Sequence, residues 1–546
     1  MFARVKKSGK YEYLQLVENK KIDKKTKQRV VATLGRLDEL RDKGQIESLI
    51  RSLSRFSEKN LMILSGKSDP DVSAVKIGPA LIFERLWNET GIKKAILEAL
   101  KGREYQFDVE RAIFLTVLHR LMASGSDRHC EMWRRDYHIE GTASLGIHNL
   151  YRAMNFLGEE IEDQKNATPF SKRCVKDLIE ESLFESRRDL FSNLDLVFFD
   201  TTSIYFEGEG GCKLGKKGFS KDHRPDLNQM VVGAIIDDKG RPICCEMWPG
   251  NTADVKTLIP VVERLRERFH IKTICIVADR GMISDETLKI LEDKEHPISY
   301  ILGVRMRNCK DVKTEVLTTG GRYHEVHPEP LKVNDPSPLK VKEVRFKGIR
   351  YIVCVNSRQA RKDENAREAI LNDLKTKLKS GPKQLIGNKG YRKYLTVTRD
   401  SVRIDTDKIE SEERFDGKWV LRTNTSLSPA QVALKYKDLW MVERIFRDVK
   451  TMIETRPVFH HKDQNIRGHV FCSFLALVLR KELDQRLALF EHDFEWAQIK
   501  QDLKALQIVT IKETGKTFEI RSRCEGVCSK IFQAVGVALP PSIREV

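Results

Sequence analysis

Two acidic residues follow strand-like apolar runs in the central part of the chain. The run at 196–199 ends on Asp200, and the run at 274–278 ends on Asp279. A carboxylate on a buried strand is costly unless it is paired, hydrogen-bonded or bound to a metal ion. Asp is also common in the turn that follows a strand, so each residue alone has a purely structural explanation. Because the pattern occurs twice, both acids are candidate functional residues.

Glu443 is a third candidate acid, and it lies in a segment with helical periodicity. The sequence from 426 to 454 begins with helix-capping residues and repeats its apolar residues every three or four positions, which predicts one long helix. Tyr436, Glu443 and Lys450 repeat at the same spacing, on a stripe about 100° from the apolar one. Glu443 is therefore expected at the edge of the core. The solvated face of an ordinary amphipathic helix would have the same pattern.

Three carboxylates, two after strands and one on a helix, offer the hard oxygen ligands that Mg²⁺ prefers. Without a metal ion, three clustered acids would repel one another and partly protonate. Two such ions about 4 Å apart activate a nucleophilic oxygen and stabilise the leaving oxygen during displacement at phosphorus. Asp200, Asp279 and Glu443 are therefore predicted to form a metal site that acts on phosphodiesters.

The charge of the chain indicates a polyanionic partner. Lys and Arg number 97 against 79 Asp and Glu, which gives a formal net charge of +18. Nucleic acid fits this excess best, and an anionic membrane surface is the alternative. No basic amphipathic helix supports a membrane role, and the apolar stretch at 470–479 is far shorter than a spanning helix. The 11 cysteines follow neither a disulfide nor a zinc pattern, which favours a cytoplasmic protein with reduced thiols.

Composition and periodicity along the chain predict a mixed α/β fold with several parts. Strands, a helix and a further strand follow one another between 191 and 300, an order that is typical of a mixed α/β sheet. The predicted parts are a small basic β unit at 1–60, a helical region at 61–190, the first part of an α/β core at 191–300, a mainly β segment at 301–425, the second part of the core at 426–485 and a C-terminal region at 486–546. The basic unit is predicted to bind DNA, and a solvated charged hairpin is the alternative.

Several motifs, in this order, resemble those of the DDE transposases of bacterial insertion sequences. They are FFDTTSIYF around Asp200, GNTAD before the second acid, VADRGM around that acid, and YKDLWMVERIFRDVK around Glu443. The last motif is similar to the Tyr-x2-Arg-x3-Glu-x6-Lys signature of one group of these enzymes, with Tyr436, Glu443 and Lys450 at matching positions. Leu439 stands where that signature has Arg.

The resemblance implies a ribonuclease H-like catalytic core, interrupted by a mainly β insertion and preceded by a helical and basic N-terminal region. It also implies cut-and-paste DNA transposition. Asp200, Asp279 and Glu443 would hold the catalytic Mg²⁺, for which Mn²⁺ can substitute. The region at 61–190 would bind the DNA ends, and the region at 486–546 would contribute to dimerisation.

The resemblance further implies several DNA contacts. Tyr436 and Lys450 would contact phosphates of the transposon ends, and Arg444 or Arg447 would replace the missing Arg of the signature. Trp419 occupies a place similar to that of a Trp in the insertion of related enzymes, which stacks on a flipped base. A core Trp of a β-strand is the alternative interpretation of Trp419.

The implied partners are the terminal inverted repeats of a mobile element, its target DNA and a second copy of the chain, with no membrane. The implied location is the bacterial cytoplasm, on the DNA of the nucleoid. Two other functions stay open on the sequence alone: a metal-dependent nuclease or resolvase without strand transfer, and a transposase-derived protein that only binds DNA. Retention of all three acids disfavours the second, because a protein that only binds DNA gains nothing from them.

Overall fold

The chain folds into two compact units. The first comprises residues 1–78, 501–529 and 538–546, and the second comprises 79–500 and 530–537. None of the helices in the described part of the chain is both long and apolar enough to cross a membrane. The computed structural model describes residues 1–22, 25–54, 71–165, 167, 171–187, 196–271, 274–293, 298–326, 339–380, 389–397, 402–448, 450, 458–513 and 516–546.

The basic N-terminal segment forms a small antiparallel sheet in the first unit. Its elements are β1 (Phe2–Ser8), β2 (Tyr11–Ile22), β3 (Lys25–Arg36), α1 (Leu37–Asp42) and α2 (Gln45–Ser54). The strands pair in the order β1-β2-β3, with Ala3 opposite Leu16 on β2 and Glu18 opposite Arg29 on β3. Gly9 has a φ of 62° in the two-residue turn between β1 and β2, a conformation that favours glycine.

A second sheet in the first unit joins two distant parts of the sequence. It contains β4 (Asp71–Lys76), β16 (Gln507–Glu513), β17 (Lys516–Arg521) and β18 (Ile543–Glu545), in the order β18-β17-β16-β4. β4 pairs antiparallel with β16, so that Val72 lies opposite Ile511 and Val75 lies opposite Ile508. The C-terminal strands, predicted as part of a separate region, therefore fold together with a strand from the N-terminal part.

Helices dominate the early part of the second unit. They are α3 (Gly78–Glu89), α4 (Ile92–Ala99), α5 (Val109–Met122), α6 (Asp127–Trp133), α7 (Ile147–Leu157) and α8 (Val175–Arg187), followed much later in the sequence by α16 (Asp463–Leu489). α17 (Trp496–Ala505) and α18 (Cys528–Val535) each have residues in both units. The region predicted as helical at 61–190 thus holds these early helices and also the strand β4; its residues 61–70 lie outside the described part of the chain.

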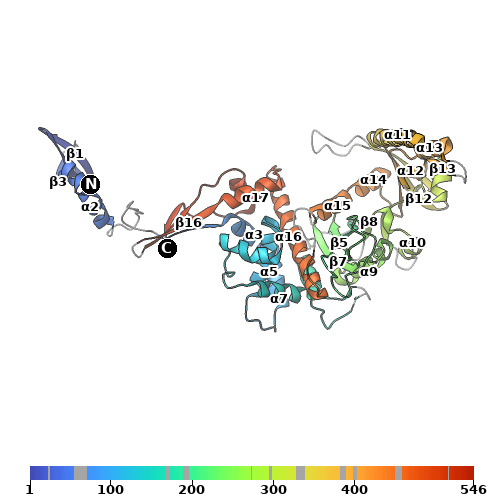
Figure 1. Cartoon of the computed structure of the whole chain (residues 1–546), viewed down its shortest axis with the longest axis horizontal. Helices are drawn as coiled ribbons and strands as arrows, with labels where there is room; N and C mark the ends of the chain where they lie inside the picture. Colours follow the sequence, from blue (N-terminus) through green and yellow to red (C-terminus); the bar gives the residue numbers. More distant parts are fainter. Residues whose placement is uncertain are drawn as a thin grey trace. The chain divides into compact units, whose positions relative to one another are not determined.

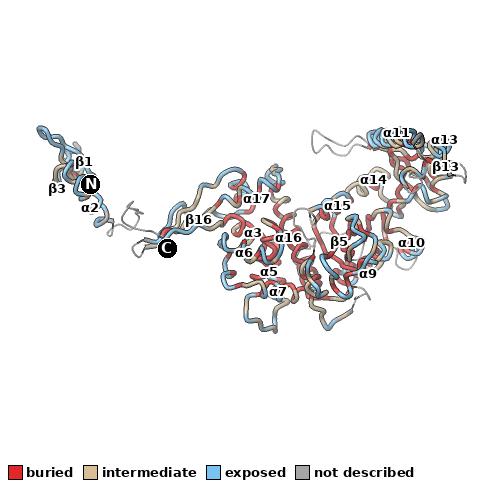
Figure 2. The backbone as a smooth tube through the Cα atoms, in the orientation of Figure 1, coloured by how far each residue is buried: buried red, intermediate tan, exposed pale blue. Residues whose placement is uncertain are grey.

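Close packing of α16 against α5 and α7 assembles this helical layer (Figure 1). Two glycines permit the approach of α7 to α16. A Cβ at Gly158 would lie 1.9 Å from the carbonyl oxygen of Gln464, and a Cβ at Gly468 would lie 1.9 Å from that of Met154. α5 is buried along its whole length (Figure 2).

A mixed sheet of nine strands forms the centre of the second unit. In spatial order the strands are β10 (His324–Val326), β11 (Leu339–Phe346), β12 (Ile349–Asn356), β15 (Lys418–Thr423), β9 (Ser299–Gly303), β8 (Cys275–Ala278), β5 (Leu196–Tyr205), β6 (Gln229–Asp237) and β7 (Pro242–Pro249). β8 pairs in parallel with both β5 and β9, and the other neighbours are antiparallel. This architecture confirms the predicted mixed α/β class.

Helices cover the two faces of this sheet. α9 (Leu258–Phe269) and α10 (Asp285–Leu291) share a buried apolar cluster with Phe199 of β5 and Ala278 of β8. On the other side, α14 (Pro429–Lys437) contacts β8 and β9, and α15 (Trp440–Arg447) contacts β5 and β6. The prediction of one long helix in this segment was wrong, because the chain breaks between α14 and α15 at residues 438–439. The predicted start is correct, since Ser428 caps α14.

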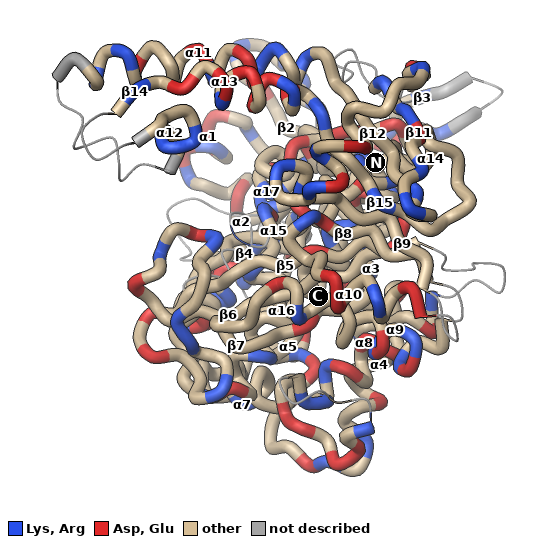
Figure 3. The backbone as a smooth tube through the Cα atoms, turned by 90° about the vertical axis from the view of Figure 1, so that its right-hand side faces the viewer, with Lys and Arg blue, Asp and Glu red and all other residues tan. Residues whose placement is uncertain are grey.

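The segment at 301–425 contains both helices and strands, so it is not mainly β as predicted. β15 pairs with β9, so β15, β12, β11 and β10 extend the central sheet. α11 (Ser357–Ser380), in the same segment, carries charges of both signs along its length (Figure 3). The remaining elements are α12 (Lys389–Arg392), β13 (Leu395–Val397), β14 (Val402–Ile404) and α13 (Thr406–Glu413).

A buried network of charged side chains joins α8 and α9 to β7. Arg268 of α9 donates from Nη2 to Oε2 of Glu180 at 2.8 Å, and from Nη1 to Oε1 of Glu246 at 3.2 Å. Lys176 Nζ donates to Oδ1 of Asp177 at 2.8 Å. Buried charges need such partners, because desolvation of an unpaired ion costs several kcal/mol. The members, none more than 6% exposed, are Lys176, Asp177, Glu180, Glu246, Arg264 and Arg268.

Candidate active site

Asp200 and Asp279 occupy equivalent positions on neighbouring strands. The parallel pairing of β5 with β8 ends where Phe199 lies opposite Ala278, and the next residue on each strand is an acid. Their backbones therefore lie at the spacing of adjacent strands, about 4.8 Å. Asp279 directly follows β8, but β5 does not end at Asp200 as predicted. β5 continues to Tyr205 because β6 supplies hydrogen bonds after the pairing with β8 has stopped.

Both acids face the side of the sheet that α14 and α15 cover. Side chains alternate between the two faces along a strand. Phe199 and Ala278, the residues directly before the acids, pack into the cluster with α9. Asp200 and Asp279 therefore project to the opposite side, where α15 packs over β5 and α14 over β8.

Tyr436 of α14 contacts Asp279 directly. Its Oη donates to Oδ1 of Asp279 at 3.0 Å. Gly303 makes room for this phenol, since a Cβ there would lie 2.3 Å from the Tyr436 Oη. Burial and the negative charges of Asp279 and Glu443 raise the pKa of Tyr436, so the phenol keeps its proton at neutral pH. Tyr436 therefore orients Asp279 in this structure, a contact that the sequence spacing did not indicate.

Glu443 lines a cavity of about 520 Å³ together with Asp279, Tyr436 and Trp419. Its side chain is exposed on α15. Asp200 is not among the residues that line this cavity. In the described part of the chain, the ligand atoms of the three acids do not all lie within 4.8 Å of one another. The structure thus places Asp200 beside Asp279 and brings Glu443 to the cavity of Asp279, without closing the three into one cage.

The surroundings of Asp200 disfavour its ionised form. Burial raises the pKa of Asp200 to about 6; the charges of Asp279 and Asp254 add to this effect, and Lys221 and the N–H of Thr201 oppose it. The Thr201 N–H donates to Oδ1 of Asp200 at 2.7 Å. Crowded carboxylates of this kind take up a proton or a cation. Their hard oxygen atoms fit a divalent ion such as Mg²⁺ or Mn²⁺.

The variant Asp200→Asn is expected to melt at a higher temperature than the wild type at pH 7.5 in EDTA. The folded-state pKa of about 6 lies above the ordinary value of Asp, so ionisation of Asp200 destabilises the fold by at most about 3 kcal/mol. The difference should shrink at pH 5, because Asp200 of the wild type is then largely protonated. Thermal melting at both pH values measures this effect, with the exposed Asp285→Asn as the control. A lower melting temperature for Asp200→Asn at pH 7.5 would contradict the raised pKa.

Comparison with known protein families identifies the chain. Residues 192–479, more than half of the 546 residues, match the family described as "Transposase DDE domain". The chain belongs to the DDE transposases. Residues 3–68 match the family described as "IS1634 family transposase, N-terminal domain". These matches confirm the resemblance to insertion-sequence DDE transposases that the motifs predicted.

The assignment also gives the activity of this transposase. DDE transposases catalyse DNA transposition and depend on divalent metal ions, and both statements apply to this family member. Among solved structures, the "piggyBac transposase synaptic complex with hairpin DNA" aligns with 78% of this chain and 79% of that chain, at 11% sequence identity and a TM-score of 0.40. No curated protein sequence matches the transposase significantly.

Three interacting polar side chains beside Asp200 were not predicted as part of the site. Thr201 Oγ1 donates to Oδ1 of Asp254 at 2.7 Å, and Lys221 Nζ lies 3.1 Å from Oδ2 of Asp254. Lys221 Nζ also donates to the Thr201 carbonyl oxygen at 2.7 Å. Asp254 belongs to the GNTAD motif, which was the only signal in the sequence, and no pattern marks Lys221. The transposase thus holds a cation and a fourth acid close to Asp200.

The basic residues predicted to contact DNA occupy different environments in the transposase. Lys450 donates from Nζ to Oδ1 of Asp222 at 2.7 Å, and its side chain is only 13% exposed. Arg447 is exposed on α15. Arg444 is also exposed, but it lines another cavity, whose lining includes Trp440 and not Asp279. Of these residues, the structure brings none into the lining of the cavity of Glu443.

Trp419 lies on β15, opposite Cys354 of β12. The residue is half-buried and lines the cavity that contains Asp279 and Glu443. Its indole Nε1 is buried and has no hydrogen-bond partner among the described residues. Buried Trp N–H groups usually have a partner, so this donor has an unmet hydrogen bond at the edge of the candidate site.

Proposed function

We propose that Asp200, Asp279 and Glu443 together bind the divalent ions of the transposase and thereby direct cleavage of transposon ends and joining to target DNA. The observation that carries this proposal is the position of two acids side by side after the parallel pairing of β5 with β8, facing the helix that carries Glu443. Binding of one ion by all three acids requires their side chains to come closer. The exposed Glu443 is the residue with most freedom to do so.

Mg²⁺, with Mn²⁺ as a substitute, is the proposed ion, because all three ligands are carboxylates. When bound, it supplies charge neutralisation at phosphorus and a more acidic nucleophilic oxygen. The protein's own contributions are separate. Asp200 and Asp279 provide adjacent negative charges, and Tyr436 keeps Asp279 oriented through its hydrogen bond of 3.0 Å. Tyr436 is therefore proposed as a positioning residue in addition to its predicted phosphate contact.

We assign the strands β7-β6-β5-β8-β9 with α9, α14 and α15 to a ribonuclease H-like core. The segment at 301–425 enters between β9 and α14 as the proposed insertion. Trp419 from this insertion is proposed to contact DNA in the cavity of about 520 Å³, which its partnerless indole N–H supports. Arg447 is proposed to replace the missing Arg of the signature, with Arg444 as the alternative. Lys450 is proposed to contact a DNA phosphate once its ion pair with Asp222 has opened.

The proposed partners are the inverted repeats that end the element, the target DNA and a second copy of the transposase. The net charge of +18 supports DNA as the partner. Joining of two ends to one target is simplest with two copies, one for each end. The site of action would be DNA of the bacterial nucleoid.

The test uses the wild-type protein with duplex DNA that carries its element ends and a supercoiled target. We expect nicks at the ends and joined products with Mg²⁺ or Mn²⁺, and little product with Ca²⁺, whose looser coordination suits in-line displacement badly. Cleavage without joined products would favour a metal-dependent nuclease. Binding without any cleavage would favour a protein that only binds DNA.

A further inference from the structure

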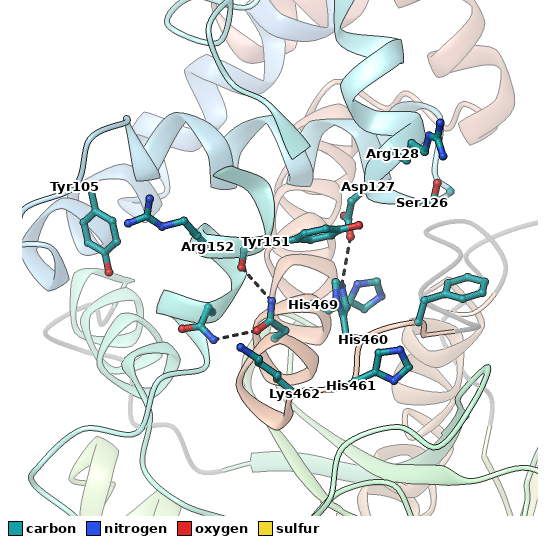
Figure 4. Close-up of a pocket in the computed structure, with 14 residues that line it drawn as sticks. Tyr105, Ser126, Asp127, Arg128, Tyr151, Arg152, His460, His461, Lys462 and His469 are labelled. Carbon is teal, nitrogen blue, oxygen red and sulfur yellow. Dashed lines mark hydrogen bonds and ion pairs between the residues drawn. The ribbon is translucent and has the colours of Figure 1, made fainter. Parts of the chain in front are cut away.

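A second cavity, of about 1020 Å³, lies where α6, α7 and the segment before α16 meet (Figure 4). None of the three acids of the candidate active site contributes to it. Its walls come from the start of α6, from α7, from residues 459–462 and the first turns of α16, and from Tyr105. All of these belong to the second unit. Its volume is at the upper end of the range of roughly 300–1,000 Å³ for small-molecule sites, so it can admit one or two nucleotides but not a duplex.

The lining of this cavity is strongly basic. Arg128, Arg152 and Lys462 line it and are exposed, and none has an acidic partner within the described ranges. Asp127 is the one acid in the lining, and it lies 3.3 Å from Nε2 of His460. Burial acts to raise the pKa of Asp127, but His460 and nearby cations hold it at about 2. The cavity therefore has unmatched positive charge, which suits phosphate groups.

Aromatic rings lie among these cations. Phe459 is 60% exposed and Tyr151 is 39% exposed, and both line the cavity. Arg152 stands over the ring of Tyr105, with its guanidinium carbon 6.0 Å from the ring centre. Exposed rings next to unpaired cations are the combination that binds single-stranded nucleic acid, because rings stack on bases while cations contact the backbone.

A metal ion is the other ligand that this cavity suggests. Within the described ranges, one group of three potential metal ligands has its ligand atoms within 4.8 Å of one another: Asp127, His460 and His469. However, Nη2 of Arg120 lies 2.9 Å from Nδ1 of His469, so Nδ1 accepts a hydrogen bond and Nε2 carries the proton. A protonated nitrogen cannot bind a metal, and the guanidinium would repel the ion. The three residues therefore form a hydrogen-bonded network at the wall of the cavity.

The cavity is connected to the strand that carries Asp200. Val458, the residue before Phe459, forms a bridge with Phe206 just beyond the end of β5. Its N–H donates to the carbonyl oxygen of Tyr205 at 3.4 Å. The six residue-to-residue steps from Asp200 to Phe206 span about 20 Å of extended chain, which equals about six base-pair steps of B-DNA. A strand bound at the active site can thus reach this cavity.

We propose that this cavity binds an unpaired part of a DNA strand, with Arg128, Arg152 and Lys462 at its phosphates and Phe459 or Tyr151 against a base. The proposal rests on the proposed function, because it takes the DNA of transposition as the occupant. It adds a binding site for single-stranded DNA outside the site of Asp200, Asp279 and Glu443.

The test measures binding of a fluorescent oligothymidine strand to the full chain by anisotropy, in EDTA and over a range of salt. For the triple variant Arg128→Gln, Arg152→Gln, Lys462→Gln we expect affinity to fall by about tenfold or more. The slope of log affinity against log salt should fall by about 2, since each lost phosphate contact on a single strand accounts for about 0.7. The matched control changes three exposed lysines elsewhere: Lys94→Gln, Lys289→Gln and Lys310→Gln.

Phe459→Ala is the second variant. Phe459 is exposed, so the change removes little packing, and the melting temperature of the variant checks that it is folded. The change should weaken binding by about tenfold, because the stack of a base on the ring is lost. The salt slope should stay unchanged, because no phosphate contact is lost. Binding by both variants that equals that of the control would overturn the proposal. So would binding of Zn²⁺ that His460→Ala abolishes, together with no detectable strand binding by the wild type. Because the assay contains no metal, a transposase that fails to cleave can still pass it.

Discussion

Cleavage of transposon-end DNA is expected to fall by about 10³-fold or more in each of the variants Asp200→Asn, Asp279→Asn and Glu443→Gln. Each change keeps the volume of the side chain but removes a charge that would hold the divalent ion. DNA binding should persist, because Lys and Arg side chains supply it, and it should strengthen where a negative charge leaves the groove. Double variants should be little worse than single ones, since groups that act as a unit are not additive. A gel assay of cleavage beside a binding assay measures both.

The controls for this experiment are Asp285→Asn and Glu286→Gln, two exposed acids in the first turn of α10. Both should cleave at the wild-type rate. Normal cleavage by a folded Glu443→Gln variant would show that the third ligand is another residue. Asp254, which lies close enough to Asp200 to raise its pKa, would then be the next acid to test.

The second large effect concerns stability, and its subject is Arg268. This side chain is paired with Asp177, Glu180 and Glu246, all of them buried. Arg268→Met keeps much of the volume but leaves three buried acids with too few cations. Removal of one partner from a buried ion network costs about 3–5 kcal/mol. We expect the midpoint of urea unfolding and the melting temperature of the transposase to fall accordingly.

Arg266→Met is the matched control, because Arg266 is on the same helix and only partly buried. It should change the free energy of unfolding by less than about 1 kcal/mol. An equal loss of unfolding free energy in the two variants would mean that the buried network contributes no more to stability than ordinary surface charges do. A further comparison, Arg268→Lys, should recover part of the loss, since it keeps the charge but not the bidentate geometry.

The adjacency of Asp200 and Asp279 was predictable, because two apolar runs that end on acids indicate neighbouring strands. The continuation of β5 beyond Asp200 was not predictable. It depends on pairing with β6, and the sequence around Asp200 has no pattern that indicates this pairing. The break between α14 and α15 carried no signal either, since residues 438–439 contain neither Pro nor Gly. That break places Tyr436 and Glu443 on separate helices, so their helical spacing in the sequence did not describe one face.

Burial of charge was the hardest feature to predict. Arg264 and Arg268 have the spacing of a solvated helix face, and their burial is favourable because of Glu246 on β7 and the acids of α8, more than 80 residues earlier. The pairing of β4 with β16 is similar, because strand partners distant in sequence leave no local pattern. Trp419 lay between two interpretations for the same reason, because the cavity beside it is lined by residues from β11, β12, α11, β15, α14 and α15, which are far apart in the sequence.

The partnership of β4 and β16 sets an order of events during synthesis. β4 leaves the ribosome about 430 residues before its partner strand exists. At roughly 5–20 residues per second, that interval lasts about 20–90 s. During this time β4 has an open edge, which is a template for pairing with other chains. A nascent transposase therefore has its whole central sheet and α16 synthesised before its first unit can close, and synthesis stopped before residue 507 would release a chain with that edge still exposed.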